Sequence, residues 1–245
     1  NQQSEQSWQN GKLHGLTTSW YEDGAKISEV PFVTGNQHGT GQGWYTNGVL
    51  SWRRAWNMNK PQGMWQAWYD TAVQESEEPY ENGQRHGTAR RWFASGDDRE
   101  LSTWSYGQRD GLWRIWYDGG QLREDGGYAK NQADGQWQRF YPDGDKQMVT
   151  SYAKGKLHGA LEAWYPSGQQ ARTETYDHDN LDGALQHWYG NGQLARDENW
   201  TKGTADGLFR AWLPDGTWQS TTCYVDGSQV WNAATEADGD AKSCP

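Results

Sequence analysis

Histidine and carboxylate side chains recur in this chain immediately before a glycine, and both kinds of side chain can hold metal ions or move protons. Four of the six histidines stand at such positions, together with four aspartates and one glutamine: His14, His38, Gln62, His86, Asp110, Asp134, His158, Asp182 and Asp206. The phrase KLHG appears twice, at 12–15 and at 156–159. This set is the kind expected of a row of zinc ligands or acid–base groups.

The glycines that follow these residues recur every 24 positions without insertion or deletion. We call them the anchor glycines, and they are Gly15, Gly39, Gly63, Gly87, Gly111, Gly135, Gly159, Gly183 and Gly207. A period of this length is typical of repeat proteins, in which each unit is one supersecondary element that packs on its neighbours. The element that positions the histidines is therefore the repeat itself.

The spacing of the repeats argues against a shared metal ion in this row. Equivalent residues of neighbouring repeats are expected two strands apart, about 9.6 Å, whereas the ligands of one zinc ion lie about 2.0–2.3 Å from it. His, Asp and Gln at a turn can all form hydrogen bonds with nearby backbone amides, which explains why the three types interchange. We therefore expect a structural role for this row, with no metal and no cofactor.

The two histidines outside the row, His178 and His187, lie near Asp177, Asp179 and Asp182. A local acid–base or metal site there is the alternative hypothesis, although its spacing repeats no known ligand motif. The chain has no phosphate-binding loop, no nucleophile elbow and no HExxH motif. Because repeats supply the same residues many times while catalysis needs a unique constellation, we expect a protein that is not an enzyme.

Each repeat predicts two short strands and two tight turns. Five residues after each anchor glycine stands a large aromatic residue, followed in most repeats by Tyr: Trp20, Trp44, Trp68, Trp92, Trp116, Phe140, Trp164, Trp188 and Trp212. A turn with Asn-Gly, Asp-Gly or Ser-Gly follows in most repeats, although the third repeat has Ala72. A second strand then leads to another aromatic column, which is Trp8, Phe32, Trp56, Tyr80, Trp104, Tyr128, Tyr152, Tyr176, Trp200 and Tyr224. Gly, Asn or Asp stands three residues later, where a left-handed backbone is expected.

These elements predict an all-β fold. Nine 24-residue hairpin units, with about eighteen strands, are expected to form one long twisted antiparallel sheet or solenoid, because an ordinary open sheet of that width would curl or split. Adjacent Trp and Tyr residues are expected to point to opposite faces, and rings to pack across neighbouring strands. The repeat array is expected over 1–227, and 228–245 is expected to cap the last strand, since Trp231 stands where a tenth anchor glycine would fall.

Composition and charge limit the partners. Hydrophobic residues make up 33% of the 245 residues, yet there are 18 Trp and 13 Tyr, which separates the chain from disordered proteins. The net charge of −10 argues against a nucleic-acid partner and gives no indication of membrane contact. No stretch of the sequence is apolar enough to span a membrane.

The two cysteines, Cys223 and Cys244, both lie in the last 23 residues. A disulfide between them would close the tail onto the last repeat and would fit an oxidising compartment, while two free thiols are the alternative. The sequence begins at Asn1 rather than Met, as after removal of a signal peptide or after trimming. We expect an extracytoplasmic protein of the periplasm, cell surface or medium, and a cytoplasmic one if the chain was trimmed.

Five tryptophans are the candidate contact residues, because exposed indole rings dominate binding surfaces. Trp65, Trp113 and Trp137 fall two residues after an anchor glycine, and we expect them on a face that the regular columns of other repeats do not use. Trp52 and Trp218 are solitary. The alternative for each of the five is a structural role, in which the ring packs against neighbouring side chains of the sheet.

Three segments carry a resemblance to a known family: NGKLHGLTTSWYEDG, KGKLHGALEAWYPSGQQ and DNLDGALQHWYGNGQLARDE. They resemble the bacterial variant of the MORN repeat, a family that includes YwqK-type antitoxins, and the likeness extends over about residues 8–227. The resemblance implies an elongated repeat sheet used for binding, with protein scaffolding and lipid association both known for MORN proteins. It carries no catalytic motif onto this chain.

A second resemblance involves GLWRIWYDGGQL and DGQWQRFYPDG, which are similar to the aromatic hairpin repeats of choline- and glucan-binding cell-wall modules. The His/Asp-Gly and Asn-Gly columns fit the MORN variant better. The expected function is therefore binding of a macromolecule. A protein partner is favoured, and a toxin is one such partner. Binding of a glycan or the cell wall through the Trp and Tyr rows is the alternative.

Overall fold

The structure is a computed structural model that describes residues 3–245, and it is all-β apart from one short helix. The chain divides into two compact units, residues 1–121 and 122–245, which are described one at a time. The predicted fold class, an all-β array of antiparallel hairpin repeats, is confirmed in both units. Among the described residues, the helix is too short and too polar to cross a membrane.

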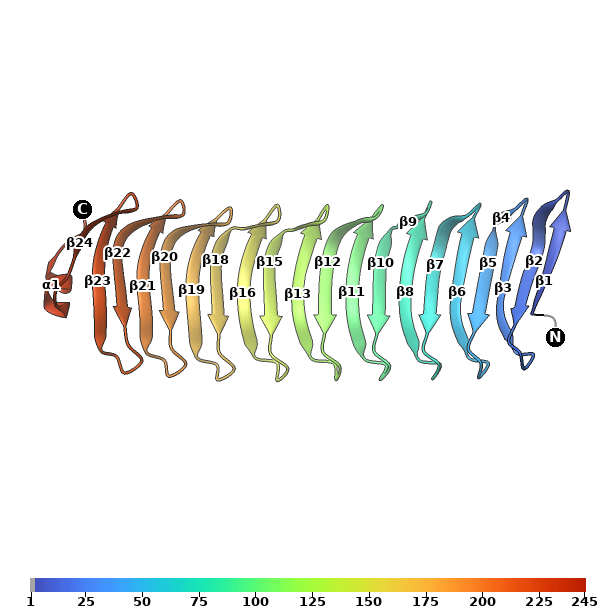
Figure 1. The fold of residues 1–245 in the computed structure, drawn as a ribbon, viewed down its shortest axis with the longest axis horizontal. Helices are drawn as coiled ribbons and strands as arrows, with labels where there is room; N and C mark the ends of the chain where they lie inside the picture. Colours follow the sequence, from blue (N-terminus) through green and yellow to red (C-terminus); the bar gives the residue numbers. More distant parts are fainter. Residues whose placement is uncertain (1–2) are drawn as a thin grey trace. The chain divides into compact units, whose positions relative to one another are not determined.

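Unit 1 is an antiparallel meander in which strands pair with their neighbours along the chain, and both halves of a split strand pair with the strand before it (Figure 1, blue to green). Its strands are β1 (Ser4–Gln9), β2 (Lys12–Trp20), β3 (Lys26–Val33), β4 (Asn36–Gln37), β5 (Gly39–Trp44), β6 (Leu50–Asn57), β7 (Lys60–Trp68), β8 (Gln74–Glu81), β9 (Gln84–Arg85), β10 (Gly87–Trp92), β11 (Asp98–Ser105) and β12 (Gln108–Trp116).

Unit 2 repeats the same meander and ends in the helix (Figure 1, yellow-green to red). Its elements are β13 (Leu122–Ala129), β14 (Gln132–Ala133), β15 (Gly135–Phe140), β16 (Lys146–Ala153), β17 (Lys156–Leu157), β18 (Gly159–Trp164), β19 (Gln170–Asp177), β20 (Asn180–Trp188), β21 (Leu194–Thr201), β22 (Thr204–Trp212), β23 (Trp218–Val225), β24 (Ser228–Asn232) and α1 (Glu236–Ala241).

The strands outnumber the predicted eighteen for two reasons. β1 and β24 flank the repeats, and four first strands are split in two at the residue before the anchor glycine, at His38, His86, Asp134 and His158. All nine anchor glycines, in split and unsplit strands alike, have φ between 69° and 123°. A side chain disfavours that backbone region, which explains why this position is glycine throughout.

The two turns of each repeat differ. The turn after the first strand has three residues, as in Glu22, Asp23 and Gly24, and is closed by hydrogen bonds from Tyr21 N to Ala25 O (2.8 Å) and from Gly24 N to Tyr21 O (3.0 Å). The Asp23 carboxylate accepts from Ala25 N, which explains the preference for Asn, Asp or Ser there.

The turn after the second strand has two residues, both with positive φ, as in Asn10 (50°) and Gly11 (73°). This is the backbone of a type I′ hairpin turn, which matches the twist of the strands that it joins. The predicted left-handed column is therefore confirmed.

The Tyr that follows each first-strand Trp lies outside the strand, at the start of the three-residue turn. There its hydroxyl donates to the carbonyl of the Trp one repeat further on, as from Tyr45 to Trp68 O (2.8 Å) and from Tyr165 to Trp188 O (2.8 Å). The expectation of a second ring row within the first strands is thus wrong for these tyrosines. They link one repeat to the next.

The sheet has little conventional core. Seven apolar residues of the described chain are buried, and they are Trp56, Ala89, Trp137, Leu161, Leu185, Cys223 and Ala233. Aromatic and polar side chains stacked on the sheet face take the place of a second layer, because each ring covers a large apolar area.

At the C-terminus, β24 pairs with β23, and the following helix is capped by Thr235, whose hydroxyl accepts from Asp238 N. Cys223 and Cys244 form a disulfide with a Cα–Cα distance of 5.6 Å. The disulfide expected between them is present.

Candidate binding site

Aromatic rings gather on one face of unit 1, and we call it the ring face. Residues that pair directly across an antiparallel sheet point to the same face. Trp52 pairs with Gly43 and Ala67, and Gly63 pairs with Tyr80. The rings of this face include those of Trp52, Trp56, Trp65, Tyr80, Trp104 and Trp113.

Four of these rings form a continuous cluster on strands β6 to β8. Ring centroids are 6.1 Å apart for Trp52 and Trp56, 5.4 Å for Trp56 and Trp65, and 4.7 Å for Trp65 and Tyr80. The Trp65 indole also donates to the Ala55 carbonyl at 2.8 Å. Trp65 thus shares a face with the second-strand ring column, and the expectation of a separate face is wrong, because the register aligns its position with that column.

Two glycines make room for this cluster on the neighbouring strand β5. A Cβ atom on Gly43 would lie 2.2 Å from the Trp52 indole nitrogen, and one on Gly41 would lie 2.9 Å from the Trp56 ring. Both distances are shorter than van der Waals contact, so any other residue would displace the rings. The glycines in this repeat are therefore part of the ring face.

Arginine side chains lie over the rings. The Arg54 guanidinium is 5.2 Å from the Trp52 centroid and 5.1 Å from that of Trp65. Arg85 lies 4.9 Å from the Trp104 ring, and Arg109 lies 4.7 Å from the Trp113 ring. These are cation–π distances. Rings and guanidinium groups therefore alternate along the ring face.

A buried carboxylate holds part of this arrangement in place. The Glu78 side chain is 14% exposed and accepts from Arg85 at 2.7 Å and from Arg91 at 2.6 Å. Burial alone would raise the pKa of Glu78, but the hydrogen bond from Arg91 and the charge of Arg85 outweigh it and hold the pKa below its usual value. The carboxylate stays ionised and fixes both arginines.

The remaining candidate tryptophans lie in unit 2. Trp137 is 7% exposed, stands between Tyr128 (5.2 Å) and Tyr152 (6.0 Å), and donates to the Gly127 carbonyl. Trp218 is half-buried, and its indole donates to the Thr221 hydroxyl at 3.0 Å. Trp137 thus offers little surface to a partner.

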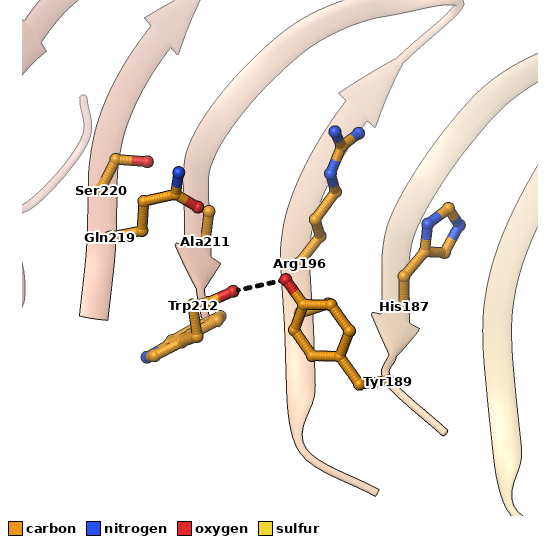
Figure 2. Close-up of a pocket in the computed structure, with 8 residues that line it drawn as sticks. His187, Tyr189, Arg196, Ala211, Trp212, Gln219 and Ser220 are labelled. Carbon is orange, nitrogen blue, oxygen red and sulfur yellow. Dashed lines mark hydrogen bonds between the residues drawn. The ribbon is translucent and has the colours of Figure 1, made fainter. Parts of the chain in front are cut away.

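A shallow hollow of about 500 Å³ lies on unit 2, lined by His187, Tyr189, Ala195, Arg196, Ala211, Trp212, Gln219 and Ser220 (Figure 2). In Figure 2 the Tyr189 hydroxyl meets the Trp212 carbonyl, at 3.0 Å, while His187 and Arg196 stand on neighbouring strands. The hollow is open to solvent.

His187, which lines this hollow, also contacts a buried acid. The Glu174 side chain is 4% exposed and accepts from His187 Nε2 and from the Tyr176 hydroxyl, each at 2.8 Å. Burial and the adjacent carboxylate raise the pKa of Tyr176 to about 12. His187 is therefore paired with Glu174 and does not converge with His178.

The row of residues before the anchor glycines has the expected structural role at four positions. Each side chain accepts from the backbone amide 20 residues further on: Thr34 N donates to His14, Asn82 N to Gln62, Lys154 N to Asp134 and Lys202 N to Asp182. His158 differs, because its Nδ1 lies 3.1 Å from the Asp177 carboxylate, beside His178.

Sequence analysis missed the arginines of the ring face and the buried acids. Arg85 and Arg109 stand two residues before an anchor glycine, where the KLHG repeats have Leu13 and Leu157. The acids stand two residues before the second-strand rings, at Glu78, Glu174 and Glu198. A comparison of repeats that looked for charge at otherwise apolar positions would have found the arginines.

Comparisons with known proteins agree with the repeat architecture. Residues 13–33 and 109–130 match the family model described as the MORN repeat variant, which supports a MORN-repeat protein. Among curated proteins, no sequence matches the chain.

Two solved structures are similar at low level. One, titled "Crystal Structure of TcdB2-TccC3-Cdc42", is 10% identical over 96% of this chain and 17% of that chain, with a TM-score of 0.22. The other, titled "Crystal Structure of TcdB2-TccC3", is 11% identical over 98% of this chain and 18% of that chain, with a TM-score of 0.15. The chain spans less than a fifth of their length, and TM-scores this low carry no conclusion.

Proposed function

We propose that this protein is a non-enzymatic binding repeat that holds a protein partner on the ring face of unit 1. The observation that carries the proposal is the alternation of half-buried rings with guanidinium groups, seen at Trp52, Arg54 and Trp65. Trp, Tyr and Arg are the residues that dominate the energetics of protein interfaces. The MORN repeat match supports the same general role.

The charge of the ring face indicates what it binds. The chain carries a net charge of −10, yet the arginines of this face, at 54, 85, 91 and 109, outnumber the nearby acids Glu78 and Glu100. A basic strip on an acidic protein selects a partner segment that combines acidic and apolar side chains. A toxin with such a segment is the case implied by the resemblance to YwqK-type antitoxins.

We further propose an extracytoplasmic location. The Cys223–Cys244 disulfide supports it, since structural disulfides persist in oxidising compartments.

The test uses the full-length chain as bait for proteins from the source cells and their medium, followed by measurement of affinity for the isolated partner. The double variant Arg54→Ala/Arg109→Ala removes two stacked guanidinium groups from the ring face. We expect affinity to fall roughly 30-fold, which corresponds to about 2 kcal/mol.

The matched control is Arg53→Ala/Arg114→Ala, which removes the same charge from the same two strands. Arg53 pairs with Gln42 and Gln66, and Arg114 pairs with Leu101, so both lie on the opposite face. Equal loss of binding in both double variants, or no loss in the first, would overturn the ring-face proposal.

A glycan partner is the second candidate, favoured by half-exposed indole rings that stand next to hydrogen-bonding arginines and acids. Sugars stack on such rings. Soluble cell-wall polysaccharide should then quench and shift the tryptophan fluorescence of the intact chain. An unchanged spectrum at high polysaccharide concentration would exclude this candidate.

A further inference from the structure

Two histidines and one aspartate converge on the edge of unit 2 where β17 and β19 end. His158 Nδ1 lies 3.1 Å and His178 Nδ1 lies 2.5 Å from the same Asp177 oxygen, Oδ1. The two imidazole centroids are 4.8 Å apart, and one ligand atom from each of the three residues falls within 4.8 Å of the others. Among the described residues, this is the group whose donor atoms are suited to a common metal ion.

We propose that His158, Asp177 and His178 form a binding site for a divalent transition metal ion, with zinc as the ion of choice. Two imidazoles and one carboxylate are ligands that zinc accepts, with bonds of about 2.0–2.2 Å. Ligand atoms around a tetrahedral zinc ion lie roughly 3.4 Å apart, given those bonds. The three donor atoms lie within 4.8 Å of one another, so metal binding requires the side chains to rotate toward a common ion. Magnesium and calcium are disfavoured, because they take oxygen ligands.

The site is open to solvent. The side chains of His158, Asp177 and His178 are 49%, 50% and 53% exposed. An ion therefore reaches the site freely, and water completes its coordination. Three protein ligands with an open fourth position distinguish this arrangement from a closed structural zinc site.

The backbone around the site is held by further bonds. Asp179 donates its amide to the Leu157 carbonyl at 2.9 Å, and its carboxylate accepts from Leu157 N at 2.8 Å. These bonds tie the turn that carries His178 to the segment that carries His158. The backbone positions of His158 and His178 are thereby held next to each other.

Another repeat provides an internal comparison. His86 occupies the same column as His158, and its ring contacts Tyr106 with centroids 4.3 Å apart, as the His158 ring contacts His178 at 4.8 Å. Ser105 and Tyr106 stand where unit 2 has Asp177 and His178. The scaffold is thus the same in both repeats. The site around His158 differs from the equivalent position around His86 by two side chains, Asp177 in place of Ser105 and His178 in place of Tyr106.

The experiment measures zinc binding to the untagged, disulfide-bonded full chain by titration calorimetry, with cobalt absorption spectra as a second readout of ligand type. We expect one zinc ion per chain. His158→Gln and His178→Asn should each weaken binding about 10-fold or more, a loss typical of metal-site changes. Both variants keep the fold, because Gln62 occupies the column of His158, and Asn10 and Asn82 occupy that of His178 with positive φ.

Two further variants sharpen the test. His86→Gln is the matched control and should leave zinc binding unchanged. Ser105→Asp/Tyr106→His transplants the site beside His86 and should raise the stoichiometry to two. Absence of zinc binding to the native chain, or equal binding by the native, His158→Gln and His178→Asn proteins, would overturn the proposal.

Discussion

At the scale of single residues, backbone conformation explains more of this sequence than side-chain chemistry does. Ala72 has φ of 67° in the three-residue turn, where the other eight repeats have glycine. A Cβ atom in the left-handed region costs roughly 1 kcal/mol. The third repeat therefore carries a strained turn.

Replacement of Ala72 by Gly should relieve that strain. We expect the free energy of unfolding to rise by about 0.5–1 kcal/mol, since relief of strain exceeds the added entropy of the unfolded chain. Urea denaturation followed by tryptophan fluorescence measures the change. Gly48→Ala, at the same position of the preceding repeat, should lower the free energy of unfolding. If Ala72→Gly and Gly48→Ala changed the free energy of unfolding in the same direction, the explanation would be contradicted.

The sequence predicted the role of the residues before the anchor glycines but not the contact between His158 and His178. The anchor row was assigned correctly at His14 and Asp134, because His and Asp both accept from an amide at one fixed distance along the chain. The convergence of His158 with His178 was not foreseen. The two residues belong to different columns, and the spacing argument compared residues within one column only.

At the scale of the elements, hydrogen bonds with a constant sequence offset join successive repeats within each unit. In eight of the two-residue turns, the amide of the second residue donates to a carbonyl 22 residues earlier, as from Gly35 to Leu13 and from Gly203 to Leu181. The tyrosine hydroxyls add bonds over 23 residues. Within each unit, a repeat is therefore fixed by its neighbours, as expected for a linear array.

Loss of one tyrosine hydroxyl should weaken this coupling. Tyr165→Phe removes the 2.8 Å hydrogen bond to Trp188 O, so that carbonyl loses the tyrosine hydroxyl as a donor. We expect a loss of about 0.5–1.5 kcal/mol in the free energy of unfolding. Thermal unfolding followed by circular dichroism provides the measurement.

The chain supplies the reverse experiment. Phe93 occupies the same column and lacks the hydroxyl, so Phe93→Tyr should stabilise the protein by a similar amount. If neither substitution changes the unfolding transition, the hydroxyl bonds do not couple the repeats.

The period, the turns and the strand pairs were predictable, because glycine spacing and turn residues encode them directly. The position of the first-strand tyrosines was not. The sequence places Trp68 and Tyr69 side by side, and alternation along a strand would send them to opposite faces. The strand ends at Trp68, so Tyr69 follows the geometry of the turn.

At the scale of the whole molecule, the protein folds with few buried aliphatic side chains. Stability must then come from repeated local contacts rather than from one central core, and the exposed edges of the array need protection. At the C-terminal end β24, helix α1 and the disulfide cover β23, where Gly239 packs on Thr221 and Ala233.

Reduction of Cys223–Cys244 should loosen this end first. The disulfide spans 21 residues, and a loop of that size contributes roughly 3 kcal/mol. We expect faster amide hydrogen exchange in β24 and α1 after reduction, with exchange in β16 to β21 unchanged. Equal exchange in the oxidised and reduced proteins would show that the disulfide does not hold the end.

The constant offsets of 22 and 23 residues also have a consequence for how the chain can change. An in-frame duplication of one unit in the gene would supply each new donor with a new acceptor at the same offset, and the bonds on either side would re-form between the copies. A few units carry residues that most repeats lack at the same position, such as Arg54, Arg109 and His178. Such a lineage can therefore alter its length by recombination while point substitutions in single units change what it recognises.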